Sequence, residues 1–221
     1  MFNLNPQELF GIIIRIPIVL ISLSVHEVAH GYAAYKLGDP TARNLGRLNL
    51  NPLKHLDPVG AVCMLLFGFG WAKPVPINTR YFKNPRRGMA LSSLAGPLSN
   101  LLMAFVAFTI HAYIFRFGFE SLITEPGSIV YMLELFFLEF FWLNITLAVF
   151  NLMPIPPLDG SRILFVFLPD KLYFGIMKYE QFISIALFAC LWLGVFDSPI
   201  SFIIGIFTIA FNFIIKFFPF L

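Results

Sequence analysis

The sequence predicts an all-α polytopic membrane protein, with about five to six transmembrane helices and a short membrane-associated β or extended region after the first. Of its 221 residues, 58% are hydrophobic and only 12% are charged, about half the charged share of an ordinary soluble domain. A soluble fold of this length cannot bury so much apolar surface. No polar stretch is long enough for a second domain, so we expect residues 1–221 to form a single integral-membrane domain.

Five apolar runs are candidates for membrane spans. A transmembrane helix needs about 20 predominantly apolar residues, with a range of about 17 to 25. Residues 163–168 are too short to cross, and we expect them to enter the membrane partway or to extend the element that begins at Asp159. The run at 182–196 is marginal, whereas the others are long enough. The five runs are 9–36, 89–115, 129–153, 182–196 and 199–218.

The stretch 45–78 differs from both a span and an ordinary loop. It is rich in glycine and proline, and its apolar middle at 60–71 is short. Short extended pieces with turns fit this composition better than a helix. Such backbone can lie at membrane depth only where protein or a cavity satisfies its polar groups.

Basic residues orient the predicted spans. Nine of the fifteen Lys and Arg residues lie within 36–87, together with only two acids, so this loop is expected to be cytoplasmic. The next loop, 116–128, has one Arg and two Glu and is expected outside. Five crossings fit the alternation, with the N-terminus outside the cell membrane.

The first span carries a metal-binding pattern. His26-Glu27-Val28-Ala29-His30 is an H-E-x-x-H motif in a predicted helix. Residues i and i+4 share a helix face, so both imidazoles can reach one metal ion. Glu27 projects nearby and can act on a water molecule at the metal. Ionisable groups within a span are costly and usually functional, which weighs against two histidines that merely pack between helices.

A catalytic zinc takes three protein ligands and keeps a position for water. Asp159 is the strongest candidate for the third, because it follows a span across three prolines and precedes Gly160, which permits a sharp turn. Taken alone, Asp159 could equally be a helix N-cap. His55, in the basic loop, is the next candidate, and His111 is isolated in the second span.

These segments together resemble the site-2 protease family of intramembrane zinc metalloproteases. The resemblance is to compact prokaryotic members and covers residues from about 20 to 170. The chain has no segment like the PDZ or CBS domain of many relatives. Besides HEVAH, the matching segments are NLMPIPPLDG at 151–160, LGDPTAR at 37–43, HLDPVG at 55–60, GWAKPVPIN at 70–78 and AGPLSN at 95–100.

The resemblance implies one zinc ion per chain, held by His26, His30 and Asp159, with Glu27 as the catalytic base. It further suggests that Asn151 and Pro157 line the substrate site. The activity implied is hydrolysis of peptide bonds within or near transmembrane segments of other proteins, with the active site toward the cytoplasmic side. Expected partners are those protein substrates and the lipid bilayer. Nothing argues for nucleic acid, and oligomeric state is left open.

Several alternatives stay open at this point. Asn151 could hydrogen-bond between helices instead of contacting substrate, and Asn144 is the better candidate for such a bond. The stretch 60–78 could offer a strand edge to an unwound substrate, or be a structural loop. His55 and Asp57 fit a turn better than a catalytic role.

Two other functions compete with a protease. A transporter or channel could use Glu134 and Glu139 within a span, although the paired halves of a repeat transporter are missing. An inactive relative that only binds membrane helices would be expected to have lost Glu27.

Overall fold

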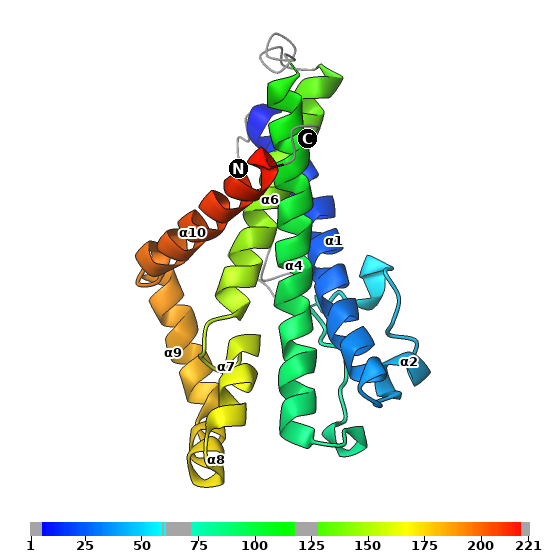
Figure 1. Cartoon of the computed structure of the whole chain (residues 1–221), viewed down its shortest axis with the longest axis vertical. Coiled ribbons are helices and arrows are strands. Elements are labelled where there is room, and N and C mark those ends of the chain that lie inside the picture. Colours follow the sequence, from blue (N-terminus) through cyan, green and yellow to red (C-terminus); the bar gives the residue numbers. More distant parts are fainter. Residues whose placement is uncertain (1–5, 59, 61–71, 118–127, 218–221) are drawn as a thin grey trace.

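The computed structural model describes residues 6–58, 60, 72–117 and 128–217, and its elements there are helices (Figure 1). The α-helices are α1 (Pro6–Lys36), α2 (Thr41–Asn44), α4 (Pro85–Arg116), α6 (Ile129–Asn151), α7 (Asp159–Leu164), α8 (Asp170–Lys178), α9 (Glu180–Trp192) and α10 (Asp197–Lys216). Three short 3₁₀ turns are η1 (Pro52–Lys54), η2 (Thr79–Tyr81) and η3 (Phe165–Phe167).

Four helices are long and apolar enough to cross a membrane, which confirms the all-α polytopic prediction. They are Ile13–Lys36, Pro85–Arg116, Ile129–Asn151 and Asp197–Lys216. The marginal run at 182–196 falls on α9, which meets α8 at a bend of 63°, and this pair would make a fifth span. The described residues hold no sixth span, because 163–168 only continue α7 into η3 and stay too short.

Local signals explain where the long helices start and stop. The side chain of Asn84 accepts a hydrogen bond from a backbone N–H of the first turn of α4, and Pro85 occupies the first helical position, where no N–H is needed. Ser128 caps α6 in the same way. That helix ends at Asn151 because prolines at 154, 156 and 157 cannot donate the next helical hydrogen bonds.

The centre of the fold is a three-helix group of α1, α4 and α6, which pack side by side (Figure 1). One face of α1 is buried at every fourth residue, and so is the facing stripe of α4. Many of these side chains are small or polar, which lets the helices approach closely. The α1 stripe is Ile18, Ser22, His26, His30 and Ala34, and the α4 stripe is Ser92, Gly96, Asn100, Ala104 and Phe108.

An apolar core occupies the other half of this group. Phe108 of α4 packs against Phe141 of α6, with ring centroids 5.0 Å apart, and α10 adds Phe211 to the same cluster. Aromatic and branched side chains of this kind supply most of the packing between helices in the protein interior. The small and polar side chains between α1 and α4 therefore occupy one part of the bundle, and the apolar core occupies the other.

Two acidic side chains of α6 contact side chains of other helices. Arg15 of α1 donates to both carboxylate oxygens of Glu139 on α6, at 3.1 and 3.0 Å. Glu134 of α6 is buried and accepts from His111 of α4. The two acids that the sequence offered for an ion path thus each tie one helix to another.

The stretch 45–78 departs from its prediction. In the part that the structure describes it contains no strand, and a single antiparallel bridge joins Leu56 to Ala72. Prolines at 52, 58, 74 and 76 lack the N–H groups that a ladder needs, so the expected β region is not supported there. Isolated bonds fasten it instead: Lys73 N donates to His55 O, and Asn78 N donates to Asp39. Residues 59 and 61–71 lie outside the described residues.

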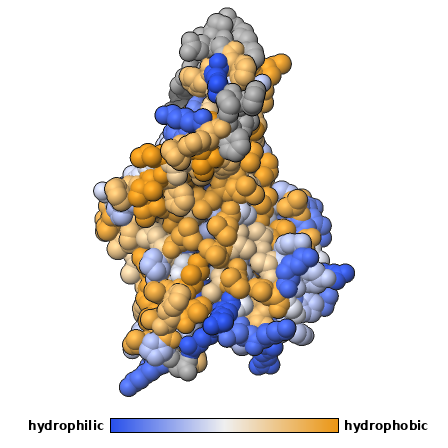
Figure 2. All heavy atoms as spheres, in the orientation of Figure 1, coloured by the Kyte–Doolittle hydropathy of each residue, from blue (hydrophilic) through white to orange (hydrophobic). Residues whose placement is uncertain are grey.

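Apolar residues dominate the middle of the face in Figure 2, and hydrophilic residues gather toward its lower end, around α2, α8 and the start of α4. The lower end also holds the C-terminus of α1 and the N-terminus of α4 (Figure 1). This distribution is that of a multi-pass membrane protein with an apolar belt.

Candidate active site

Helix α1 brings two imidazoles together, as the H-E-x-x-H spacing predicts. His26 and His30 are both buried, and their Nε2 atoms lie 2.9 Å apart. Four residues turn an α-helix by about 400°, so the two side chains leave the helix about 40° apart. With a rise of about 1.5 Å per residue, His30 lies about 9 Å and His26 about 15 Å from the Lys36 end of the helix.

Asp159 joins these histidines from the start of α7, a helix that packs against α4. Its Oδ2 atom lies 3.2 Å from Nε2 of His26 and 3.1 Å from Nε2 of His30. Asp159 is the first residue of α7, and Leu158 occupies the N-cap position, so the N-cap interpretation of Asp159 is wrong. The irregular chain between α6 and α7 is what carries this carboxylate back to α1.

A close turn fixes that approach. A Cβ atom on Gly160 would lie 2.2 Å from the carbonyl oxygen of Leu152 and 2.5 Å from that of Met153. Both are backbone atoms, which cannot swing aside. Only glycine therefore lets the start of α7 fold against the end of α6.

The three ligand atoms match the size of a tetrahedral zinc site. Their separations are 2.9, 3.1 and 3.2 Å. Zinc bonds of about 2.0–2.1 Å at tetrahedral angles place neighbouring ligand atoms about 3.3 Å apart, so a small opening of the triangle would admit the ion. Two imidazoles and a carboxylate are also a ligand set that zinc accepts in catalytic sites.

Asp159 is poised as an anionic ligand. Burial raises the pKa of its carboxyl, but hydrogen bonds and charges from His26 and His30 outweigh burial and lower the pKa to about 2. The carboxylate is therefore ionised at neutral pH, as a metal ligand must be.

Helix α4 forms the wall behind the imidazoles. A Cβ atom on Gly96 would lie 2.4 Å from Cε1 and Nε2 of His30 and 2.6 Å from Cε1 of His26. The same helix supplies a partner for each Nδ1 atom: the Ser92 carbonyl oxygen at 2.8 Å from His30, and Asn100 Oδ1 at 2.5 Å from His26. Gly96 thus allows a contact that holds both rings.

Glu27 contacts the segment 72–78. Its Oε2 atom accepts a hydrogen bond of 2.7 Å from the backbone N–H of Val75. Arg47 holds the same segment by donating to the carbonyl oxygen of Lys73 at 2.7 Å. The segment 72–78 therefore orients the Glu27 carboxylate, and Arg47 in turn holds that segment in place.

The remaining candidates fall in different places. Asn151 is half-buried at the end of α6, and its amide donates to the carbonyl oxygen of Leu147 in its own helix, at 3.0 Å. Asn144, not Asn151, makes the bonds between helices, to Asn100 and Ser22. Pro157 is exposed in the chain that leads to Asp159.

The other candidate ligands do not join the cluster. Among the described residues, the group of metal-binding side chains comprises His26, His30 and Asp159. His55 lies in the turn after η1 and bonds the Asn49 carbonyl oxygen. Asp57 accepts from the N–H of Gly60, three residues on, as expected of a turn.

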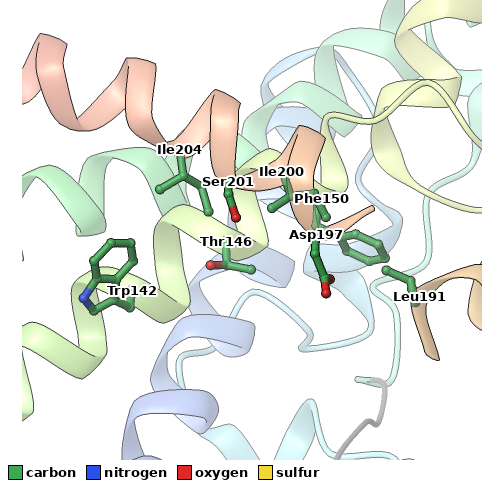
Figure 3. Close-up of a pocket in the computed structure, with 8 residues that line it drawn as sticks. All are labelled: Trp142, Thr146, Phe150, Leu191, Asp197, Ile200, Ser201 and Ile204. Carbon is green, nitrogen blue, oxygen red and sulfur yellow. The ribbon is translucent and has the colours of Figure 1, made fainter. Parts of the chain in front are cut away.

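A cavity of about 530 Å³ opens between α6, α9 and α10, close to the end of α6 (Figure 3). Its α6 wall is formed by three residues at helical spacing, ending at Phe150, next to Asn151. Asp197 and Ser201 add polar groups from α10. Its full lining is Trp142, Thr146, Phe150, Leu191, Asp197, Ile200, Ser201 and Ile204.

Comparison with known protein families identifies the family of this chain. The model of peptidase family M50 matches residues 14–193, a range that includes every side chain of the cluster. The chain belongs to peptidase family M50. This confirms the resemblance to the site-2 proteases.

Individual relatives of this M50 chain agree. It is 47% identical over 164 residues to "Putative zinc metalloprotease YwhC" of Bacillus subtilis, covering 74% of this chain and 73% of YwhC. It is 33% identical to Rip2 of Mycolicibacterium smegmatis, which carries the same description, over 64% of this chain and 52% of Rip2. "Zinc metalloprotease MJ0392" of Methanocaldococcus jannaschii is 27% identical over 73% of this chain and 35% of its own length. No solved structure matches the chain.

The M50 chain thus belongs to a family of zinc metalloproteases, and zinc is its cofactor. Sequence reasoning about this peptidase missed the contributions of Gly96, Asn100 and Val75. Their only signal was the small and polar AGPLSN segment in the middle of an apolar span, and the match of that segment and of GWAKPVPIN to the family.

Proposed function

We propose that this M50 peptidase is an intramembrane zinc metalloendopeptidase, which hydrolyses peptide bonds within or near the transmembrane segments of other proteins. One observation carries the proposal: Asp159 meets His26 and His30 within α1, a helix long and apolar enough to span a membrane. The cluster lies about 9–15 Å along the helix from its Lys36 end, within the apolar length of the span.

We assign His26, His30 and Asp159 as the ligands of one zinc ion per chain. When bound, zinc supplies Lewis acidity to the attacking water and to the scissile carbonyl. Glu27 is the general base: its carboxylate takes a proton from that water and returns it to the leaving nitrogen. The bond from Val75 leaves the second carboxylate oxygen of Glu27 for this exchange.

Asn151 is the proposed donor to the developing oxyanion or to the unwound substrate backbone, and Pro157 is proposed to line the same substrate site. To serve, its amide must turn away from the Leu147 carbonyl oxygen that it contacts in this structure. Catalytic hydrogen bonds often tighten only when substrate is present, so this change is compatible with the role.

The substrates we propose are transmembrane helices. Such a helix hides its peptide bonds in its own hydrogen bonds and must unwind before hydrolysis. The cavity between α6, α9 and α10 is lined mainly by apolar side chains, and its lining includes Phe150, the residue before Asn151 in the chain (Figure 3). We propose that this cavity receives part of the substrate segment from the lipid.

The proposed orientation places the 36–87 loop and the nearby active site at the cytoplasmic face of the cell membrane, with the N-terminus outside. Nine of the fifteen Lys and Arg residues support this arrangement.

The alternatives receive less support. A transporter or channel would need free intramembrane acids, whereas Glu134 and Glu139 each contact a cation or imidazole of another helix. An inactive binding relative would not need the Glu27 carboxylate beside the two histidines.

The test uses the full chain in lipid nanodiscs. We expect about one zinc per chain and cleavage of a single-span substrate protein at a site within its apolar segment. Glu27→Gln should keep zinc and abolish cleavage, because the ligands remain and only the base is lost. A wild-type preparation that holds zinc but cleaves only soluble, unfolded peptides would refute the intramembrane assignment.

A further inference from the structure

A chain of buried polar side chains runs from His26 across all three central helices. Asn100 of α4, Asn144 of α6 and Ser22 of α1 are each fully buried. Asn100 Nδ2 donates to Asn144 Oδ1 at 2.7 Å, and Asn144 Nδ2 donates to Ser22 Oγ at 2.9 Å. Three polar groups in so apolar a bundle are costly unless every bond is made.

One carbonyl group fixes the direction of every bond in this chain. Asn144 also contacts the backbone carbonyl oxygen of Phe140, at 2.8 Å, and a carbonyl oxygen can only accept. The Asn144 atom facing it must therefore be the amide nitrogen, which leaves Oδ1 of Asn144 to face Asn100. Since that oxygen also only accepts, Asn100 must turn its amide nitrogen toward Asn144 and its own oxygen toward His26.

This direction determines the proton on His26. Facing Asn100 Oδ1 at 2.5 Å, Nδ1 of His26 must carry the hydrogen, and Nε2 then keeps its lone pair. Nε2 is the atom that points to Asp159. His30 reaches the same state by another route, because its Nδ1 faces the Ser92 carbonyl oxygen.

We propose that Asn100 is a positioning residue for the ligand His26, held in register by Asn144 and Ser22, so that the bundle itself selects the tautomer that binds zinc. The inference rests on the proposed function and adds a specific source of zinc affinity outside the ligands. Groups that orient a ligating histidine typically contribute about 10- to 100-fold to metal affinity.

The experiment measures zinc affinity by chelator competition on the metal-stripped full chain in nanodiscs, together with the visible spectrum of its Co²⁺ form. Asn100→Leu keeps the volume but removes both bonds, and we expect about 10- to 100-fold weaker zinc binding and an altered Co²⁺ spectrum. Asn100→Asp keeps a side-chain oxygen that can accept from His26, so it should bind zinc nearly as tightly as wild type.

Asn144→Leu leaves the contact between His26 and Asn100 but frees Asn100 to rotate, so its loss of affinity should be smaller. Thr109→Val is the matched control, because Thr109 is a polar residue of α4 whose hydroxyl bonds only its own helix. If Asn100→Leu is too unstable to purify, the zinc affinities of Asn144→Leu and Asn100→Asp still test the proposal.

The proposal would be overturned if Asn100→Leu bound zinc as tightly as Thr109→Val. If only Asn144→Leu is folded, the same comparison is made with that variant. The same result follows if Asn100→Asp loses as much affinity as Asn100→Leu. Failure of the wild type to bind zinc at all would instead refute the proposed function, so the two outcomes are distinguishable.

Discussion

Replacing Gly96 by alanine should disable the site with one methyl group. That methyl would lie 2.4 Å from Cε1 and Nε2 of His30 and 2.6 Å from Cε1 of His26. Contacts between such atoms are favourable at about 3.5–4.0 Å, so the rings or α4 must move by about 1 Å. The rings cannot tilt freely, because their Nδ1 atoms are bonded to Ser92 and Asn100 of the same helix.

A shift of that size exceeds what a metal site tolerates, since ligand distances must hold within about 0.2 Å. Misplacement of reacting groups by about 1 Å can lower the rate about 100-fold, and overpacking costs about 1–3 kcal/mol of stability. We therefore expect Gly96→Ala to lose zinc affinity and at least about 100-fold in cleavage rate.

The assay compares zinc content and substrate cleavage in nanodiscs with a matched control, Gly205→Ala. Gly205 is also inside a long helix, α10, but nothing lies within 4 Å of a Cβ atom there. The control should be as active as wild type and slightly more stable, because alanine is a better helix former. Normal zinc content and turnover in Gly96→Ala would refute the packing argument.

Three other changes test separate parts of the site. Asn151→Ala should lower the cleavage rate by about 10²–10³-fold while zinc content and melting temperature stay near wild type, and a loss of stability without a loss of rate would remove Asn151 from catalysis. Val75→Pro removes the N–H that orients Glu27 and should lower kcat by up to about 10²–10⁴-fold with zinc retained, whereas Val75→Ala keeps the N–H and most activity. Arg80→Cys should react with an impermeant thiol reagent only after lysis, and labelling of intact cells would reverse the proposed orientation.

The sequence was most informative where geometry is local. The i, i+4 spacing of His26 and His30 places both side chains on the same face of a helix, so the pairing of their rings could be predicted. Asp159 is a long-range partner, but it could still be singled out because prolines stop α6 before it and a zinc site needs a third ligand. Helix spans follow from apolar length in the same direct way.

Contacts between helices could not be predicted in the same way. The contact of Asn100 with His26 spans 74 residues and depends on how α1 and α4 are rotated, which composition does not encode. Likewise, the sequence displayed Glu134 and Glu139 but not their partners, His111 and Arg15. The expected β region fails in its described part because the four prolines outweigh the preference of short apolar runs for strands.

The wide separation of the ligands along the chain has a consequence for biosynthesis. Asp159 is synthesised 133 residues after His26. At about 5–20 residues per second, translation needs about 7–27 s to cover that distance. During this interval the nascent chain has the two histidines but no third ligand, and α6, which anchors Asn100, is completed only at Asn151. The site therefore lacks its third ligand until α1, α4 and α6 have all been synthesised.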